Sequence, residues 1–119
     1  FKLTKEHERH LYTNLQELVR LTNKIRATPI FVTQKSLRAN LIDSSIVSFD
    51  DKFDYYSAES EIAKIIINLC KKNNIFCIDL HNAIKFEYDD FYDLGHTTKK
   101  GTKKIAELIF LEMNNHDLP

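Results

Sequence analysis

The two glycines of this chain, Gly95 and Gly101, are the feature that most limits what it can fold into. At average usage, a chain of 119 residues carries roughly eight glycines, and here none occurs before position 95. A phosphate-binding P-loop, a dinucleotide-binding fingerprint and a Gly-x-Ser-x-Gly nucleophile elbow each need two or three glycines at fixed short spacings. The sequence therefore excludes these three kinds of site.

The length and charge favour a single globular domain, residues 1–119, with a small or neutral partner. Lysine and arginine together number 17, as do aspartate and glutamate, so the formal net charge is zero. Such a chain has no long-range field that gathers phosphates, and we expect no nucleic-acid partner. Its apolar runs are far shorter than the ~18 consecutive residues of a membrane span. We therefore expect no membrane span.

The hydrophobic pattern alternates between helical and strand-like segments. Amphipathic spacing predicts helices over residues 4–26, from Ser57 as N-cap to Asn73–Asn74, and over about 98–114. Continuous apolar runs in 30–34 and 75–80 predict strands covered on both faces, as in a parallel sheet. Residues 35–57 form a long polar connection, which we expect to bind something and to contain a short helix. The order predicts one strand–helix–strand crossover unit.

Two predicted strands are too few for an isolated parallel sheet. A two-stranded pair leaves its edges and faces uncovered, and parallel sheets occur almost only inside larger α/β layers. The chain also begins with Phe1, and its single methionine is Met113. We therefore expect the C-terminal half of a larger α/β domain, or a chain that completes its sheet with a partner. Cys70 and Cys77 are predicted to be free core residues, because no metal-ligand spacing surrounds them.

Two of the five histidines stand in contexts that suit chemistry. His7, His10 and His116 lie among polar residues, which predicts solvated surface positions. His81 directly follows the second predicted strand, where open α/β sheets bind ligands, but a histidine that caps the next turn accounts for this position as well. His96 lies three residues after Asp93, immediately before the last predicted helix.

The Asp93–His96 spacing suits a general base. A carboxylate three residues upstream in a turn can hydrogen-bond one imidazole nitrogen and leave the other free to accept a proton. The partial positive charge at the following helix N-terminus opposes formation of the imidazolium. We expect Gly95 to permit a tight turn here and Gly101 to let the helix pack closely against the sheet edge.

The segment Tyr92-Asp93-Leu94-Gly95-His96-Thr97-Thr98-Lys99-Lys100-Gly101, followed by Ile105, Ala106 and Ile109, resembles the last conserved block of the SGNH (GDSL-type) serine hydrolases. The resemblance implies a flavodoxin-like three-layer α/β/α fold with a parallel sheet, of which this chain is the C-terminal half. It implies His96 as the general base and Asp93 as the residue that orients it. It also implies hydrolysis of carboxylic esters, of the esterase, lipase or acetylesterase type, with no cofactor and no metal.

The chain departs from this family at the nucleophile. The family's serine lies in a Gly-Asp-Ser block near the N-terminus, and its oxyanion hole uses that serine's backbone with a glycine and an asparagine from two further blocks. No serine here follows Gly-Asp. We therefore expect the N-terminal half of the same domain to be a partner of this chain, a small-molecule ester to be the substrate, and these residues alone to be inactive.

Two alternatives remain open from the sequence. Asp79, His81, Asp93 and His96 are two carboxylates and two imidazoles, ligand types that suit zinc or another borderline metal ion. The other alternative is a non-catalytic flavodoxin-like interaction domain, in which the long loop with Tyr55 and Tyr56 binds a protein and His96 is structural.

Overall fold

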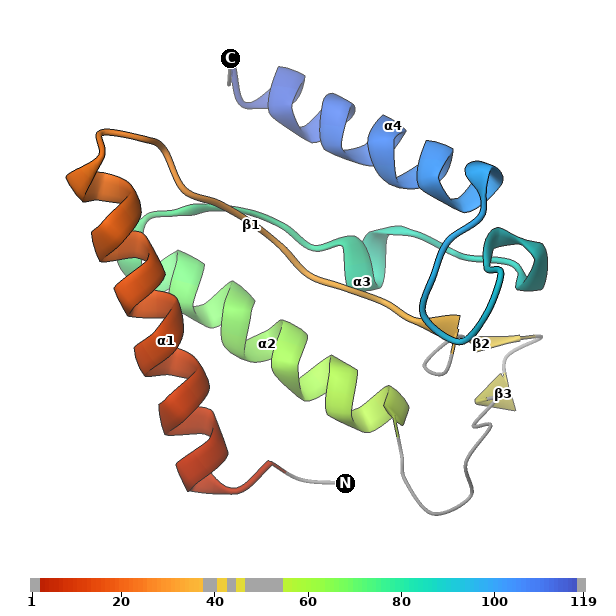
Figure 1. The fold of residues 1–119 in the computed structure, drawn as a ribbon, viewed down its shortest axis with the longest axis horizontal. Helices are drawn as coiled ribbons and strands as arrows, with labels where there is room; N and C mark the ends of the chain where they lie inside the picture. Colours follow the sequence, from red (N-terminus) through yellow and green to blue (C-terminus); the bar gives the residue numbers. More distant parts are fainter. Residues whose placement is uncertain (1–2, 38–40, 43–44, 47–54, 118–119) are drawn as a thin grey trace.

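The computed structural model describes residues 3–37, 41–42, 45–46 and 55–117. In Figure 1 two adjacent helices, α1 and α2, lie on one side of a pair of strands, and α4 lies on the other side. The elements, in chain order, are α1 (Lys5–Lys24), β1 (Ile30–Val32), β2 (Leu41–Ile42), β3 (Ser45–Ile46), α2 (Tyr55–Asn73), β4 (Phe76–Ile78), α3 (Leu80–Ala83), the 3-10 helix η2 (Tyr88–Asp90) and α4 (Lys99–Asn115).

The helix ends follow from local capping. The Thr4 hydroxyl accepts a hydrogen bond from the backbone N–H of His7 at 3.2 Å and starts α1. α1 ends at Lys24, close to the predicted end at residue 26, and Arg26 adopts φ 58° just beyond it. Asn74 adopts the left-handed conformation, with φ 53°, directly after α2, in agreement with the predicted helix end at Asn73–Asn74. The predicted N-cap Ser57 is wrong, because α2 already begins at Tyr55.

The predicted crossover is confirmed. β1 and β4 pair in parallel, with Ile30 opposite Phe76 and Val32 opposite Ile78, and α2 connects them. The backbone N–H of Thr33 extends the ladder by donating to the carbonyl of Ile78 at 3.0 Å. Among the described residues, the sheet contains these two strands, and β2 and β3 form a separate antiparallel pair. The short helix expected in 35–57 falls partly on residues 38–40, 43–44 and 47–54, which lie outside the described residues.

The expected flavodoxin-like three-layer α/β/α fold with a parallel sheet is wrong. Over the described residues the chain is mostly helical, and its parallel sheet has two strands of three residues each. The apolar runs do form strands, but they are too few and too short to make a layer. The segment after β1, the short helix α3 and the turns that follow it instead supply the main core cluster, which comprises Leu37, Leu80, Ile84, Phe86 and Phe91.

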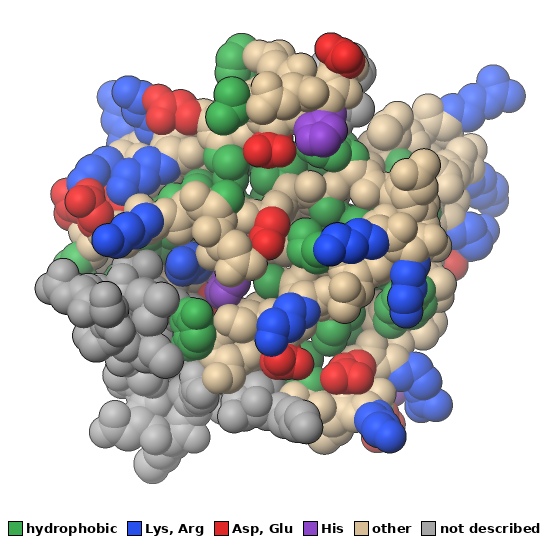
Figure 2. Space-filling model, turned by 180° about the vertical axis from the view of Figure 1, so that it is seen from behind, with side chains coloured by type: hydrophobic (Ala, Val, Ile, Leu, Met, Phe, Trp, Pro, Cys, Tyr) green, Lys and Arg blue, Asp and Glu red, His purple; other side chains and the backbone are tan. Residues whose placement is uncertain are grey.

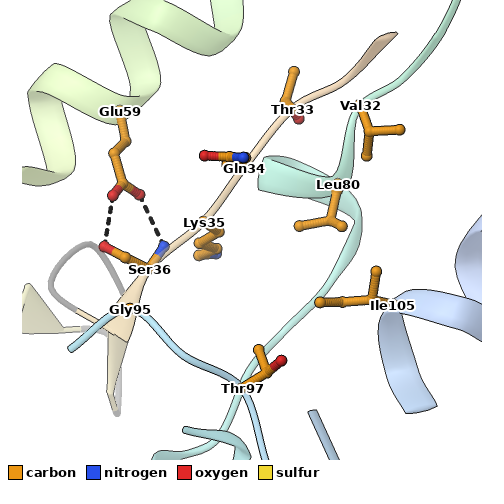
Figure 3. Close-up of a pocket in the computed structure, with 10 residues that line it drawn as sticks. All are labelled: Val32, Thr33, Gln34, Lys35, Ser36, Glu59, Leu80, Gly95, Thr97 and Ile105. Carbon is orange, nitrogen blue, oxygen red and sulfur yellow. Dashed lines mark hydrogen bonds between the residues drawn. The ribbon is translucent and has the colours of Figure 1, made fainter. Parts of the chain in front are cut away.

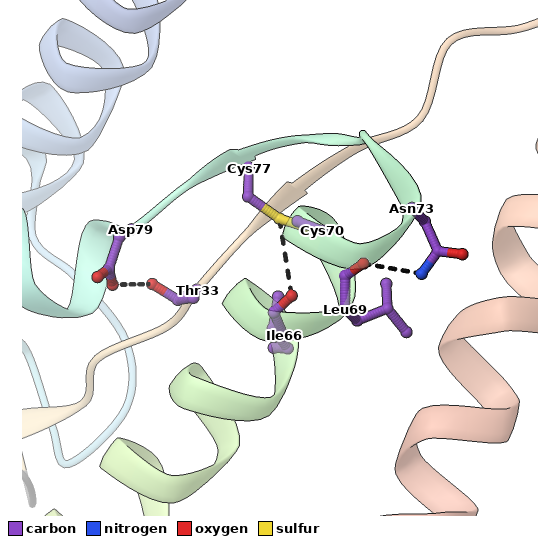
Figure 4. The surroundings of a disulfide bond; sticks show 7 residues. All are labelled: Thr33, Ile66, Leu69, Cys70, Asn73, Cys77 and Asp79. Carbon is purple, nitrogen blue, oxygen red and sulfur yellow. Dashed lines mark hydrogen bonds between the residues drawn. A yellow bond between two sulfur atoms is a disulfide. The ribbon is translucent and has the colours of Figure 1, made fainter.

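The two cysteines are joined, contrary to the prediction that both are free. A disulfide links Cys70, near the end of α2, to Cys77 in β4 (Figure 4). The sequence predicts core positions for both residues, but their approach depends on the packing of α2 along β4. Residues seven apart meet because a turn at Asn74 separates the helix from the strand.

Reduction of this disulfide is expected to destabilise the fold by about 2.5 kcal/mol, the chain-entropy value for a closed loop of about eight residues. Urea unfolding with and without a phosphine reductant measures the difference. A Cys70→Ala/Cys77→Ala double variant is the control, since its unfolding midpoint must not respond to the reductant. Equal midpoints for the wild-type chain under both conditions would contradict the prediction.

The surface combines both charges with exposed apolar side chains. On the face in Figure 2, acidic and basic side chains are interspersed, and hydrophobic side chains reach the surface between them. The large exposed hydrophobic residues include Leu18 and Leu21 on α1, Ile25 at its C-cap, and Phe110 and Leu111 on α4. No helix in the described part of the chain combines the length and the hydropathy that a bilayer span needs.

Candidate active site

Asp93 and His96 come together in the loop that precedes α4. One carboxylate oxygen of Asp93, Oδ1, accepts the backbone N–H groups of Gly95 and His96, each at 2.8 Å. The other oxygen, Oδ2, lies 2.8 Å from Nδ1 of the His96 ring. The carboxylate is therefore held by the backbone of its own turn and faces the imidazole, as the sequence spacing predicts.

This contact fixes which ring nitrogen is free. At neutral pH the carboxylate of Asp93 is ionised and can only accept hydrogen bonds, so Nδ1 of His96 carries the proton. Nε2 of the neutral ring then has a lone pair. Among the described residues Nε2 finds no hydrogen-bond partner, and the His96 side chain is 84% exposed. The pair is therefore an oriented base that an incoming hydroxyl group can reach.

The turn lowers the pKa of Asp93 to about 2. The two backbone N–H donors of Gly95 and His96 are the main cause, the His96 ring adds to the effect, and the slight desolvation of the carboxyl opposes it. Because hydrogen bonding favours the ionised form, Asp93 is a carboxylate at neutral pH.

Carboxyl NMR titration of Asp93 is expected to give a midpoint of about 2. A lowered pKa in the folded state means that the carboxylate stabilises the fold above its ordinary value of 3.8, and that this contribution is lost as the pH falls toward 2. An Asp93→Asn variant should lack this part of the acid-induced loss of stability. In His96→Ala the midpoint should rise but remain below 3.8, because the backbone donors persist. A midpoint at the ordinary value in the wild-type chain would contradict this account.

The loop is closed at its base by backbone hydrogen bonds. The N–H of Tyr92 donates to the carbonyl of His96 at 2.8 Å, and Phe91 forms an isolated antiparallel bridge with Thr97. The N–H of Thr98 donates to the carbonyl of Asp90 at 2.8 Å. Thr98 then caps α4, and its hydroxyl accepts the N–H of Gly101 at 3.3 Å. These contacts fix the Asp93–His96 loop against the start of α4.

Ion pairs attach the same end of α4 to η2. Lys104 donates to the fully buried Asp90 carboxylate at 2.5 Å, and Lys100 reaches both Glu87 and Asp89. Burial raises the pKa of Asp90, but the N–H of Glu87 and the ammonium group of Lys104 outweigh it, so the pKa is below its ordinary value. The carboxylate of Asp90 is therefore charged and holds the helix start in place.

The structural roles of Gly95 and Gly101 differ from those that the sequence predicts. Gly101 does require close packing, but against the backbone of Asp90 rather than the sheet edge. Gly95 does not need glycine for its conformation, because its φ is not positive and a Cβ there would meet nothing within 4 Å. The turn depends on the carboxylate of Asp93, which accepts two backbone N–H groups, and not on glycine flexibility.

A cavity of about 450 Å³ lies beside the loop, at the end of β1. Gly95 and Thr97, the neighbours of His96 in sequence, line one side of it. Figure 3 shows Glu59 next to Ser36 on one side of the cavity, where the Ser36 hydroxyl and N–H donate hydrogen bonds to the Glu59 carboxylate at 2.5 and 3.0 Å. The half-buried Lys35 also lines the cavity, and desolvation lowers its pKa.

The four residues of the alternative metal site have other partners. Asp93 and His96 are hydrogen-bonded to each other, whereas Asp79 accepts hydrogen bonds from Thr33 and Asn82. Among the described residues, the three-carboxylate geometry that could hold an ion occurs instead at Glu87, Asp89 and Asp90. Lys100 and Lys104 place their ammonium groups against these carboxylates.

The remaining histidines divide as follows. His7, His10 and His116 are exposed, as predicted for surface positions. His81 is buried at 3% exposure in α3, and its ring contacts Ser60 and the carbonyl of Gln34. Sequence reasoning identified His81 but missed Ser60, because a serine on one helix and a histidine after a strand give no spacing signal. It also missed Asp90, whose sequence context resembles that of any exposed acidic turn.

Comparison of the chain with protein-family models, with curated protein sequences and with solved structures finds no match.

Proposed function

We propose that Asp93 and His96 are the acid–base pair of a serine hydrolase that acts on carboxylic esters. The observation that carries the proposal is the 2.8 Å contact between Asp93 Oδ2 and His96 Nδ1, combined with the exposed Nε2 on the opposite side of the ring. The resemblance of residues 92–101 to the last block of the SGNH hydrolases supports the same roles.

The chemistry follows from this geometry. Nε2 of His96 takes the proton of a serine hydroxyl as that hydroxyl attacks the ester carbonyl, and then returns the proton to the leaving alcohol. Asp93 holds the ring in the required tautomer and stabilises the imidazolium that forms in between. The adjacent cavity at Gly95 and Thr97 is the proposed binding place for part of the ester.

The nucleophile in this proposal comes from the N-terminal half of the same domain, as expected from the lack of a Gly-Asp-Ser sequence in residues 1–119. One structural feature supports such a partner segment. β1 pairs with β4 along one edge, and in the described part of the chain no strand lies along its other edge. Unpaired backbone groups on a strand edge favour the addition of another strand. A segment bound there would lie close to the cavity beside His96.

Asp93→Asn in the full-length protein tests the proposal. By analogy with other triads whose carboxylate is neutralised, turnover of p-nitrophenyl acetate should fall by about 10⁴-fold, because the amide no longer fixes the His96 tautomer. Asp117→Asn is the matched control, since Asp117 is an exposed aspartate beyond the end of α4. Turnover of Asp93→Asn within about tenfold of wild type would argue for an interaction domain in which the loop is only structural.

A further inference from the structure

A serine–histidine pair lies away from the Asp93–His96 loop. The hydroxyl oxygen of Ser60, on α2, is 3.1 Å from Nε2 of His81, on α3. The other ring nitrogen, Nδ1, is 3.1 Å from the backbone carbonyl of Gln34. A carbonyl only accepts hydrogen bonds, so Nδ1 carries the proton, and Nε2 of the neutral ring accepts the hydroxyl proton of Ser60. The pair therefore has the polarity of a nucleophile and its base.

Hydrogen bonds also fix the backbone that carries the His81 ring. The backbone N–H of His81 donates to the Thr33 hydroxyl at 2.9 Å, and that hydroxyl donates to the carboxylate of Asp79 at 3.0 Å. Figure 4 shows this Thr33–Asp79 contact between the two strand ends. With 3% of its surface exposed, His81 has little freedom to turn away from Ser60. The base is therefore in position before any reactant binds.

Ser60 is open to small molecules. It lines a cavity of about 330 Å³ together with His81, Asn82 and Lys64. The amide of Asn82 donates to Asp79 at 2.7 Å, and the ammonium group of Lys64 lies 3.1 Å from Glu61. The cavity is thus small and polar, with the serine hydroxyl at its wall and the histidine behind it.

We propose that Ser60, activated by His81, is a nucleophilic serine that accepts an acyl or phosphonyl group from a small activated ester. In the reaction with a fluorophosphonate, the Oγ–P bond forms, the P–F bond breaks and fluoride leaves. The hydroxyl proton passes to Nε2 of His81 and then to the buffer. One transfer per chain needs no turnover, so this reactivity is compatible with a chain that does not hydrolyse esters catalytically. It is independent of Asp93 and His96.

The test treats the full-length protein with a fluorophosphonate and locates the adduct by peptide mass mapping. We expect an adduct on the peptide that contains Ser60, and none on that peptide in Ser60→Ala. Labelling of Ser60 should persist in His96→Ala, which separates this inference from the proposed hydrolase function. Ser57→Ala is the matched control, because Ser57 lies on the same helix and lines the same cavity, yet its replacement should leave the adduct in place.

The role of His81 has its own measurement. His81→Gln should slow the labelling of Ser60 by on the order of 100-fold or more, the usual contribution of a positioned base, and circular dichroism shows whether this variant is folded. In the wild-type protein, the pH profile of Ser60 labelling should follow the protonation of the His81 ring, as measured by NMR on the same sample. Absence of an adduct at Ser60, or a labelling rate independent of His81 protonation, would overturn the proposal.

Discussion

Replacing His96 by alanine in the full-length protein is expected to lower the turnover of p-nitrophenyl acetate on the order of a millionfold, as for other serine–histidine pairs that act as a unit. The reason is that Nε2 is the group placed to take the serine proton, and alanine leaves the hydroxyl without a base. The effect should appear in kcat and kcat/KM together, because the proton transfer belongs to the transition state.

The loss at His96 can be separated from a general effect of removing a histidine. His10 offers the matched control, since it is also exposed and also lies near a carboxylate, with Nε2 3.6 Å from Glu6. His10→Ala should leave turnover unchanged. The fold of His96→Ala should also be retained, because the ring is 84% exposed and packs against little. Hydrolysis that survives in a folded His96→Ala protein would refute the proposed function.

Gly101→Ala is expected to destabilise the fold by about 3 kcal/mol, the upper part of the usual range for an overpacked site. Helix propensity alone predicts the opposite sign, with alanine favoured over glycine by about 1 kcal/mol. The clash decides the outcome: a Cβ at this position would lie inside van der Waals contact with the carbonyl oxygen of Asp90 and 3.1 Å from its carbonyl carbon. Both atoms belong to the backbone, so they cannot swing away.

Gly95→Ala is the matched control for this prediction. Gly95 lies in the loop just before α4, where a Cβ meets nothing within 4 Å, and its φ is not positive. Its effect should remain within about 0.5 kcal/mol, as for ordinary surface substitutions. Urea unfolding of both variants gives the comparison. Similar stabilities for the two variants would show that the contact between α4 and the Asp90 backbone can relax.

The sequence predicted the elements that have a strong local signal. The helical spacing over residues 4–26, the helix end at Asn73–Asn74 and the helix start near residue 98 are local features, and the structure has helices ending or beginning close to each of them. The parallel pairing of the apolar runs was also predicted correctly. The predicted three-layer fold was wrong, because the hydrophobic periodicity of a segment indicates which of its faces are buried but does not determine how many strands the sheet contains.

The candidate site shows the same division between local and long-range information. The contact between Asp93 and His96 spans three residues, so a turn is enough to make it, and the sequence predicted it. The meeting of Ser60 with His81 needs α2 to pack beside the end of β4, which no short spacing records. The hydrogen bond from Lys104 to the buried Asp90 joins residues that are 14 positions apart, and it likewise depends on how α4 packs against η2.

The disulfide has a consequence for the chemistry proposed at Ser60. Cys70 belongs to the same helix as Ser60, and Cys77 to the strand that leads directly into His81. Ser60 and His81 thus belong to two segments that the disulfide links covalently, and the link on α2 lies ten residues after Ser60. Such a tether keeps the two groups at high effective concentration even when the surrounding packing loosens. The reactivity of Ser60 toward esters would then depend on the redox poise of the surroundings, and would decline in strongly reducing conditions.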